Sequence, residues 1–343
     1  MDGKSHQGAG KHAGNACSDD RKIRHIKAGQ GKADQQNNKI IDTEECLDSS
    51  QVFLFVFCGR HQVQSRSGTP GGKKTVKNAC DQAKARTGQG IVHGLNGFPR
   101  RDLDEWLDTV KTRLVGRFAL CPEMLTHQRT VDLENGGFLE EYEGPWSQRQ
   151  SRETLTPYIT KALALCKEAG LDCTGVTSPW DFGREVEEEY AAAISEAMEA
   201  VYGRKEAWYF CRGLYGVPHA RPWVSLRCDD RRVAAIPGTI HDSFWQTMDT
   251  TDTSAAYISR IADFYITEDS TAGAIPEALA MDAWPILTTH WQSQFSNGQL
   301  TGLRALTEVA RRVEANLSDR VEWTSFDELM RMTLDAPAHA VVG

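Results

Sequence analysis

The amino-acid sequence predicts an α/β protein with a parallel β-sheet. Between residues 90 and 343, short apolar runs typical of buried strands alternate repeatedly with amphipathic helical segments. Such alternation is typical of parallel sheets. This part of the chain also has the size of a single barrel domain of about 250 residues. The alternation fits an open sheet and a sheet closed into a barrel equally well.

Helices are expected where apolar residues recur with the period of a helix. In the first of them, Leu103, Leu107, Val110 and Leu114 share one face. The last begins at Ser325, because Ser325 and Glu328 have the spacing of a capping box. The expected helices cover residues 98–114, 151–169, 186–203, 253–266, 301–317 and a segment that begins at 325.

Strands are expected where short apolar runs end in polar or turn-forming residues. The stretch 132–150, which is rich in Gly and acidic residues, is expected to be a loop. The expected strands cover residues 116–121, 171–177, 207–211, 231–237, 284–290 and 320–324.

The first 89 residues differ in composition from the rest of the chain. They hold 15 Lys and Arg and nine Asp and Glu, a net charge of +6, whereas residues 90–343 hold 24 and 38, a net charge of −14. All nine Trp and all eight Tyr follow residue 89. Apart from an apolar run at 52–58, the first segment is too polar to offset the entropy cost of ordering it. We expect 1–89 to be a disordered, low-complexity segment foreign to the fold, 90–335 to form the domain and 336–343 to be a tail.

Composition also limits the partners and the compartment. The basic first segment could be a nucleic-acid arm, but the acidic domain itself is not expected to bind nucleic acid. No apolar run approaches the roughly 18–20 residues that cross a bilayer, and the polar N-terminus does not resemble a signal peptide. A cytoplasmic protein that does not bind membranes is therefore expected.

The nine cysteines are irregularly spaced and lack a CxxC pair, which indicates mostly reduced, buried thiols.

Polar and aromatic side chains follow most of the expected strands. In parallel α/β proteins the carboxyl ends of the strands lie at one edge of the sheet, where ligands bind. Each such residue also has a structural interpretation, since Asp242, for example, could simply cap a helix. Their repeated placement favours a shared site. The residues expected at this edge are Glu123, Thr126, His127, Ser178, Trp180, Asp181, His219, Arg221, Trp223, His241, Asp242, Trp245, Thr288, Thr289 and His290.

These residues leave more than one chemistry open. Aromatic rings around polar groups suit the C–H faces of sugars, and the expected substrate-binding residues are Trp180, Asp181, Trp223, Trp245 and Trp291. Glu123 and Asp181 could instead be the carboxylate pair of a glycosidase. The sequence contains no GxSxG, HExxH or GxGxxG motif, which disfavours serine hydrolases, zinc proteases and dinucleotide-binding enzymes.

Several stretches between about Gly90 and Leu334 resemble one family. They are PEMLTH (122–127), LTPYI (155–159), GLDCTGVTSPWDFG (170–183), VEEEYAAAIS (186–195), RPW (221–223), HDSFW (241–245), LTTHWQSQFSNG (287–298) and RVEWTSFDEL (320–329). They resemble bacterial relatives of the polysaccharide deacetylases, which share the NodB-type (β/α)-barrel. The resemblance implies a barrel-like fold of the glycoside hydrolase/deacetylase type. It also implies hydrolysis of the C–N bond in an acetylated carbohydrate or small amide.

The resemblance further implies roles for particular residues. His290, at the end of LTTH, would be the general acid, oriented by Asp242 and Trp245. Arg221 would belong to the family's Arg-Pro element, for which SPWDFG is the alternative position. His127 and His241 would help to bind a divalent metal such as zinc, which polarises the carbonyl and lowers the pKa of its bound water.

The chain departs from the family pattern at its start. Nothing before residue 90 matches the family's strand ending in Asp-Asp, which supplies the base and one metal ligand. The residue four positions after His127 is Val131, which cannot bind metal. The domain is therefore expected to be incomplete and to lack its first βα units. The alternative function is a non-catalytic scaffold that binds carbohydrate through Trp180, Trp223, Trp245 and Trp291.

Overall fold

The structure is a computed structural model, and it describes residues 99–336. These residues belong to one compact unit of the chain. The expected disordered segment 1–89, the apolar run 52–58 and all but the first residue of the expected tail 336–343 lie outside the described residues.

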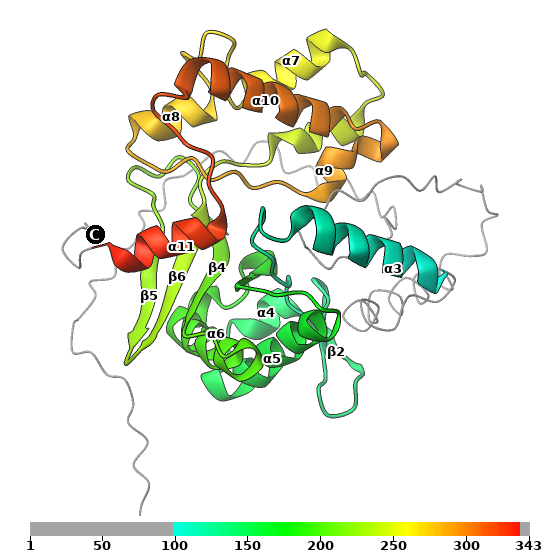
Figure 1. Cartoon of the computed structure of the whole chain (residues 1–343), viewed down its shortest axis with the longest axis vertical. Coiled ribbons are helices and arrows are strands. Elements are labelled where there is room, and N and C mark those ends of the chain that lie inside the picture. Colours follow the sequence, from blue (N-terminus) through cyan, green and yellow to red (C-terminus); the bar gives the residue numbers. More distant parts are fainter. Residues whose placement is uncertain (1–98, 337–343) are drawn as a thin grey trace, which may run out of the picture. The chain divides into compact units, whose positions relative to one another are not determined.

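The central element is a sheet whose strands lie in the order β3-β4-β6-β5 (Figure 1). Strands β3 (Gly175–Thr177), β4 (Glu206–Gly213) and β6 (Arg231–Gly238) run parallel. This confirms the prediction of an α/β protein with parallel strands. Strand β5 (Trp223–Cys228) was not predicted, and it pairs antiparallel with β6 at the edge of the sheet. Its residues are only partly buried, so it lacks the continuous apolar pattern of the central strands.

Two extended segments continue the parallel sheet on either side and curl it into half of a barrel. On one side, Thr174 N–H donates to Leu120 O at 3.0 Å. On the other side, the backbone of Ile240 forms a parallel bridge with Leu287. No strand therefore forms at 116–121, which meets the sheet only through backbone hydrogen bonds, and the strand predicted at 284–290 is reduced to a single bridge. The strand predicted at 320–324 is wrong, since these residues form no strand and Trp323 is half exposed.

Helices cover both faces of the sheet. Helices α5 (Arg152–Glu168) and α6 (Glu187–Tyr202) pack on one face, in a core that includes Tyr209 and Ala235. Helix α11 (Phe326–Asp335) packs on the opposite face, against Trp208 and Ile236, and crosses the strands in Figure 1. Alternate side chains of β4 and β6 serve the two cores, because successive residues of a strand point to opposite faces.

The sequence correctly predicts α5, α6 and α11. The side chain of Ser325 accepts from the backbone N–H of Glu328, as expected for the cap of α11. The helix predicted at 98–114 is α3 (Arg100–Thr109), followed by a π-helical turn (Val110–Leu114).

A second group of helices has its own core. It comprises η4 (Ser243–Asp249), α7 (Ala255–Asp263), α8 (Ala274–Ala280), α9 (Trp291–Phe295) and α10 (Thr301–Leu317). Its core contains Phe244, Ile261, Val309 and Val313. Helices α7 and α10 were predicted, whereas α8 and α9 were not, because two turns or fewer show no apolar period.

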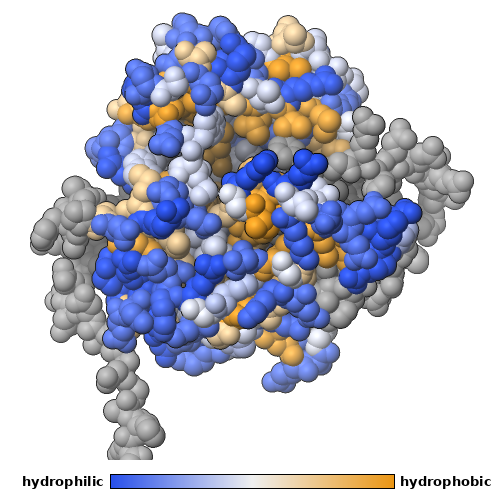
Figure 2. Space-filling model, viewed as in Figure 1, coloured by the Kyte–Doolittle hydropathy of each residue, from blue (hydrophilic) through white to orange (hydrophobic). Residues whose placement is uncertain are grey.

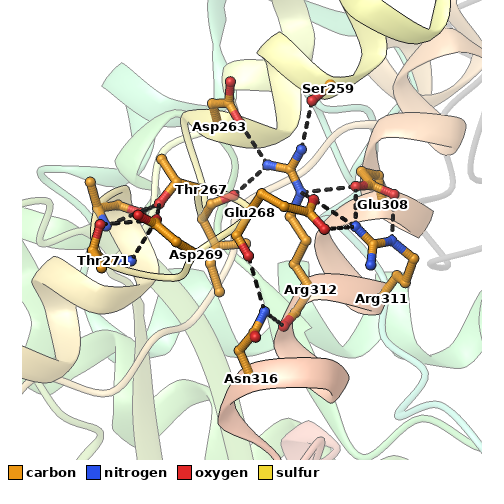
Figure 3. A network of polar contacts seen from close by, with 12 residues as sticks. Ser259, Asp263, Thr267, Glu268, Asp269, Thr271, Glu308, Arg311, Arg312 and Asn316 are labelled. Carbon is orange, nitrogen blue, oxygen red and sulfur yellow. Dashed lines mark hydrogen bonds and ion pairs between the residues drawn. The ribbon is translucent and has the colours of Figure 1, made fainter.

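A polar network fixes α10 to α7 and the loop that follows α7 (Figure 3). The side chain of Arg312 is 1% exposed, and its guanidinium contacts Asp263 at 2.6 Å and Glu308 at 2.9 Å. It also donates to the backbone oxygen of Ile266 at 2.7 Å. The neighbouring Arg311 is half exposed and shares Glu308 and Glu268. Arg312 therefore links these elements from inside the core.

The stretch 132–150 is not simply a loop, as was predicted. It contains the turn and second strand, β2 (Phe138–Tyr142), of a hairpin whose first strand is β1 (Arg129–Val131), and the short helix α4 (Glu143–Ser147). Gly136, at φ +73°, allows the hairpin to turn. The remaining short helices are η2 (Pro179–Asp181), η3 (Arg184–Val186) and η5 (Ser296–Gly298).

The surface and the cysteines add two observations. On the face shown in Figure 2, hydrophilic residues cover most of the surface, with smaller hydrophobic areas between them. None of the helices within 99–336 is long and apolar enough to cross a membrane. Cys121, Cys166 and Cys173 are buried thiols, whereas Cys228 is disulfide-bonded and is an exception to the expectation of mostly reduced cysteines.

Candidate functional site

The side chains of Asp242 and His290 form a pair at the carboxyl end of the curled sheet. Nδ1 of His290 lies 2.8 Å from Oδ2 of Asp242. The carboxylate is buried, with 5% of its side chain exposed, whereas 40% of the His290 side chain is exposed. Because Nδ1 faces Asp242, Nε2 is the ring nitrogen left for a ligand.

Local sequence explains why Asp242 is held so firmly. It precedes η4, and its Oδ1 accepts from the backbone N–H of Phe244 at 3.0 Å. Its Oδ2 accepts from the backbone N–H of His290 at 3.1 Å and from the hydroxyl of Ser293 at 2.9 Å. The capping role foreseen for Asp242 is thus confirmed, and the same carboxylate also orients an imidazole. Ser293 was not identified from the sequence, although it lies one turn after His290.

Aromatic residues pack around this pair. The ring of Trp245 meets the His290 ring edge-on, with centroids 5.1 Å apart, and is 43% exposed. Behind it, Tyr265 stacks on Phe244 at 4.2 Å, and its hydroxyl accepts from the backbone N–H of Ser243 at 2.7 Å. Burial raises the pKa of Tyr265, so this phenol stays protonated. The predicted proximity of Asp242, Trp245 and His290 is therefore present in the structure.

His241 and Thr288 lie beside the pair, together with a tyrosine that the sequence did not indicate. The ring of Tyr215 meets that of His241 edge-on at 5.4 Å. Its hydroxyl lies 3.4 Å from Oγ1 of Thr288. Tyr215 lies two residues after the end of β4, and a polar aromatic residue just after a strand was the signal that could have identified it.

A second carboxylate–imidazole pair lies at the end of the extended segment that pairs with β3. Oε1 of Glu123, which is buried, lies 2.8 Å from Nδ1 of His127. The ring of Trp180 lies 5.8 Å from that of His127, and its Nε1 donates to His127 O at 3.2 Å. Both Glu123 and His127 were expected at the edge of the sheet, but contact between their side chains was not predicted, although they are four residues apart.

Four of the eleven non-glycine residues with positive φ within residues 99–336 lie in these two loops. Met124 and His127 in one loop, and Trp180 and Asp181 in the other, have φ values between +51° and +60°. Residues other than Gly rarely adopt this conformation, and such strain gathers at functional sites. The conformation of these loops is therefore imposed by their surroundings.

Helix α4 supplies part of that support. Glu143 is fully buried, and its Oε1 accepts from the backbone N–H groups of Leu125 and Thr126 and from the hydroxyl of Tyr158. Burial raises the pKa of Glu143 to about 7, although the hydrogen bonds oppose this shift. Ser147, one turn on, accepts from the backbone N–H of Gly183 at 2.9 Å. The sequence did not reveal Glu143, because 132–150 was taken for a loop.

The other predicted site residues have different neighbours. Arg221 pairs with Asp282, which also contacts His219. Trp223 begins β5, where the guanidinium of Arg212 lies 5.6 Å from its ring. Arg221 and Trp223 are thus not part of the Asp242–His290 hydrogen-bond network.

Asp181 and Trp291 also have partners of their own. Asp181 pairs with Arg184 at 3.1 Å and helps to line a small surface pocket between the ends of β3 and β4 and the start of α6. Trp291, which follows His290 directly, packs against Phe295 at 6.3 Å.

The residues predicted to bind a metal do not form a recognisable ligand set. His127 is paired with Glu123, and His241 packs against Tyr215. Within residues 99–336, no three His, Cys, Asp or Glu side chains are grouped in a way that could hold a metal ion.

Comparison of the chain with family models, with curated proteins and with solved structures finds no match.

Proposed function

We propose that the chain is a hydrolase of acylated amines on carbohydrates, related to the polysaccharide deacetylases. The observation that carries this proposal is the Asp242–His290 pair at the carboxyl end of the sheet. A buried carboxylate that holds Nδ1 of a half-exposed imidazole fixes its orientation and stabilises its charged form. This arrangement suits proton transfer at Nε2.

The geometry supports a simple sequence of proton transfers. The oxygen of a water molecule attacks the carbonyl carbon of the amide, and its proton passes to Nε2 of His290. The same nitrogen then gives a proton to the leaving nitrogen, the C–N bond breaks, and a carboxylate and an amine are released. Asp242 keeps its charge throughout and stabilises the imidazolium.

The curled sheet supports the relationship at the level of fold. Residues 99–336 contain five parallel segments such as a NodB-type barrel has, at 120–122, β3, β4, β6 and 286–288. In a closed barrel, helices cover the outer face and strand side chains fill the interior. Here α11 covers one face of the described sheet and α5 and α6 cover the other.

The metal implied by the resemblance stays a prediction. Because the described residues do not complete a ligand set, we assign no step to a metal. Metal content per chain, measured on the purified full-length protein and on His127→Ala, tests this expectation. About one bound divalent ion that is lost in His127→Ala would add a metal to the site.

A second candidate function is carbohydrate binding without hydrolysis. Trp180 is 66% exposed although its backbone is strained, at φ +51°. Maintaining an exposed aromatic ring in a strained conformation favours a role in contacting a ligand. Under this alternative, Trp180→Ala abolishes binding of N-acetylated oligosaccharides, and wild-type protein releases no acetate from them.

The deciding experiment is acetate release from N-acetylated oligosaccharides by the full-length chain. Wild-type protein is expected to release acetate, and His290→Ala to lose about 10²–10⁴-fold in rate. The matched control is His219→Ala, which removes an exposed histidine paired with Asp282, and it should keep wild-type activity. No acetate release by wild-type protein from any substrate tested would overturn the proposal.

A further inference from the structure

Two hydroxyl groups lie next to the Asp242–His290 pair. Tyr215 follows β4 and is 44% exposed. Its hydroxyl lies 3.4 Å from Oγ1 of Thr288, which comes from the extended segment beyond β6. The hydroxyls therefore come from different parts of the sheet and meet at its carboxyl end.

Two glycines create the space for this arrangement. Gly213 and Gly238 are register partners at the ends of β4 and β6. A Cβ atom at Gly213 would lie 2.2 Å from Cε2 of Tyr215, and one at Gly238 would lie 2.3 Å from Oγ1 of Thr288. A side chain at Gly213 would displace the Tyr215 ring, and a side chain at Gly238 would displace the Thr288 hydroxyl. Glycine at both positions therefore leaves the space that these two groups occupy.

The backbone connects both hydroxyls to the reactive pair. The ring of Tyr215 packs edge-on against His241, the residue before Asp242. Thr288 precedes His290 by two residues, and the backbone of His290 is extended. Residues two apart in a chain have Cα atoms no more than about 7 Å apart. Thr288 and His290 thus lie close together, and both hydroxyls belong to the same strand ends as the Asp242–His290 pair.

The chemistry of the two groups indicates what they would bind. A separation of 3.4 Å is long for an O–H···O hydrogen bond, whose usual range is about 2.5–3.0 Å. The hydrogen bond between the hydroxyls of Tyr215 and Thr288 is therefore weak, and both hydroxyls are available to another hydrogen-bonding partner. Each hydroxyl can donate and accept, which matches a hydroxyl group better than a pure acceptor or a charged group.

We propose that Tyr215 and Thr288 form a subsite for a free hydroxyl group of the substrate, beside the amide on which His290 acts. This inference rests on the proposed function and narrows its substrate class. The substrate is a sugar that carries a free hydroxyl on the carbon next to its acylated amine. Tyr215 and Thr288 determine specificity and take no part in proton transfer.

The test compares the methyl glycoside of N-acetylglucosamine with its 3-deoxy analogue. Dissociation constants are measured by titration of the full-length wild-type chain, Tyr215→Phe and Thr288→Val. Tyr142→Phe is the control, because Tyr142 is also exposed but lies on β2. Wild-type protein and Tyr142→Phe should prefer the hydroxylated compound about tenfold, the effect of one net hydrogen bond. Tyr215→Phe and Thr288→Val should bind both compounds nearly equally.

The subsite and the hydrolase proposal can fail separately. Acetate release is measured on the same samples. If wild-type protein prefers the hydroxylated compound, Tyr215→Phe abolishes this preference and wild-type protein releases no acetate, the subsite is supported and the hydrolase proposal is overturned. Acetate release with a preference that both variants retain overturns the subsite and leaves the hydrolase proposal standing. Absence of any preference, or of any binding, in wild-type protein overturns the subsite.

Discussion

One carboxylate oxygen of Asp242 binds both the backbone and the ring of His290. Oδ2 accepts from the His290 backbone N–H at 3.1 Å and lies 2.8 Å from Nδ1 of its ring, although the residues are 48 positions apart. They are brought together because Ile240 and Leu287 pair in parallel just before them. The position of the imidazole is therefore a consequence of the sheet.

Replacing Asp242 by Asn should impair activity more than stability. The asparagine side chain carries no charge that could stabilise the imidazolium. Whichever way it is oriented, its NH2 group would face another hydrogen-bond donor, either the backbone N–H of Phe244 or the His290 ring. We expect kcat for acetate release to fall about 10²–10⁴-fold and the free energy of unfolding to fall by about 1–3 kcal/mol. Asp249→Asn, at the exposed end of the same short helix, should change neither, and equal effects of the two variants would contradict this role.

Glu143 should give the protein a pH-dependent stability. Burial raises its pKa from 4.5 to about 7 in the folded chain, so between these values the folded state binds a proton that the unfolded state has lost. The free energy of unfolding should therefore decrease by about 1.4 kcal/mol per pH unit from pH 4.5 to pH 7 through this residue and level off above. Urea denaturation of wild-type protein and Glu143→Gln across this range measures the difference, and parallel curves for the two proteins would refute the prediction.

The two adjacent arginines of Figure 3 should differ in their contribution to stability. Arg312→Met removes a buried guanidinium and leaves the buried Ile266 oxygen without this donor, so it should lower the free energy of unfolding by about 1–3 kcal/mol. Arg311 is half exposed, and Arg311→Met should cost less than about 1 kcal/mol. Thermal denaturation of both variants tests this, and a cost for Arg311→Met as large as that for Arg312→Met would contradict it.

The sequence predicts the fold best where its signal is local. The helices α5, α6, α7 and α10 and the parallel strands follow from apolar periodicity within one segment. The edge strand β5 and the hairpin with α4 do not, because their residues are only partly buried and depend on neighbours elsewhere in the chain. A local signal can also mislead, because RVEWT at 320–324 has residues typical of strands but forms no strand in the described structure.

The candidate site was predictable in part for the same reason. His290, Asp242 and Trp245 were found because each follows a strand, and the sheet then brings these strand ends together. Tyr215, Ser293 and Glu143 were missed, because their roles depend on which backbone or side-chain groups the fold places beside them. Arg221 was included because it lies in the loop after a strand, and the sequence did not reveal that Asp282 would be its partner.

The most direct test of the account is the rescue of His290→Ala by imidazole. The alanine leaves room beside Asp242, and free imidazole could then supply the missing ring nitrogen. The account predicts that His290→Ala releases acetate from N-acetylated oligosaccharides far more slowly than wild-type protein, and that added imidazole restores part of the rate. Wild-type rates in His290→Ala without imidazole would contradict the central claim that His290 transfers the proton.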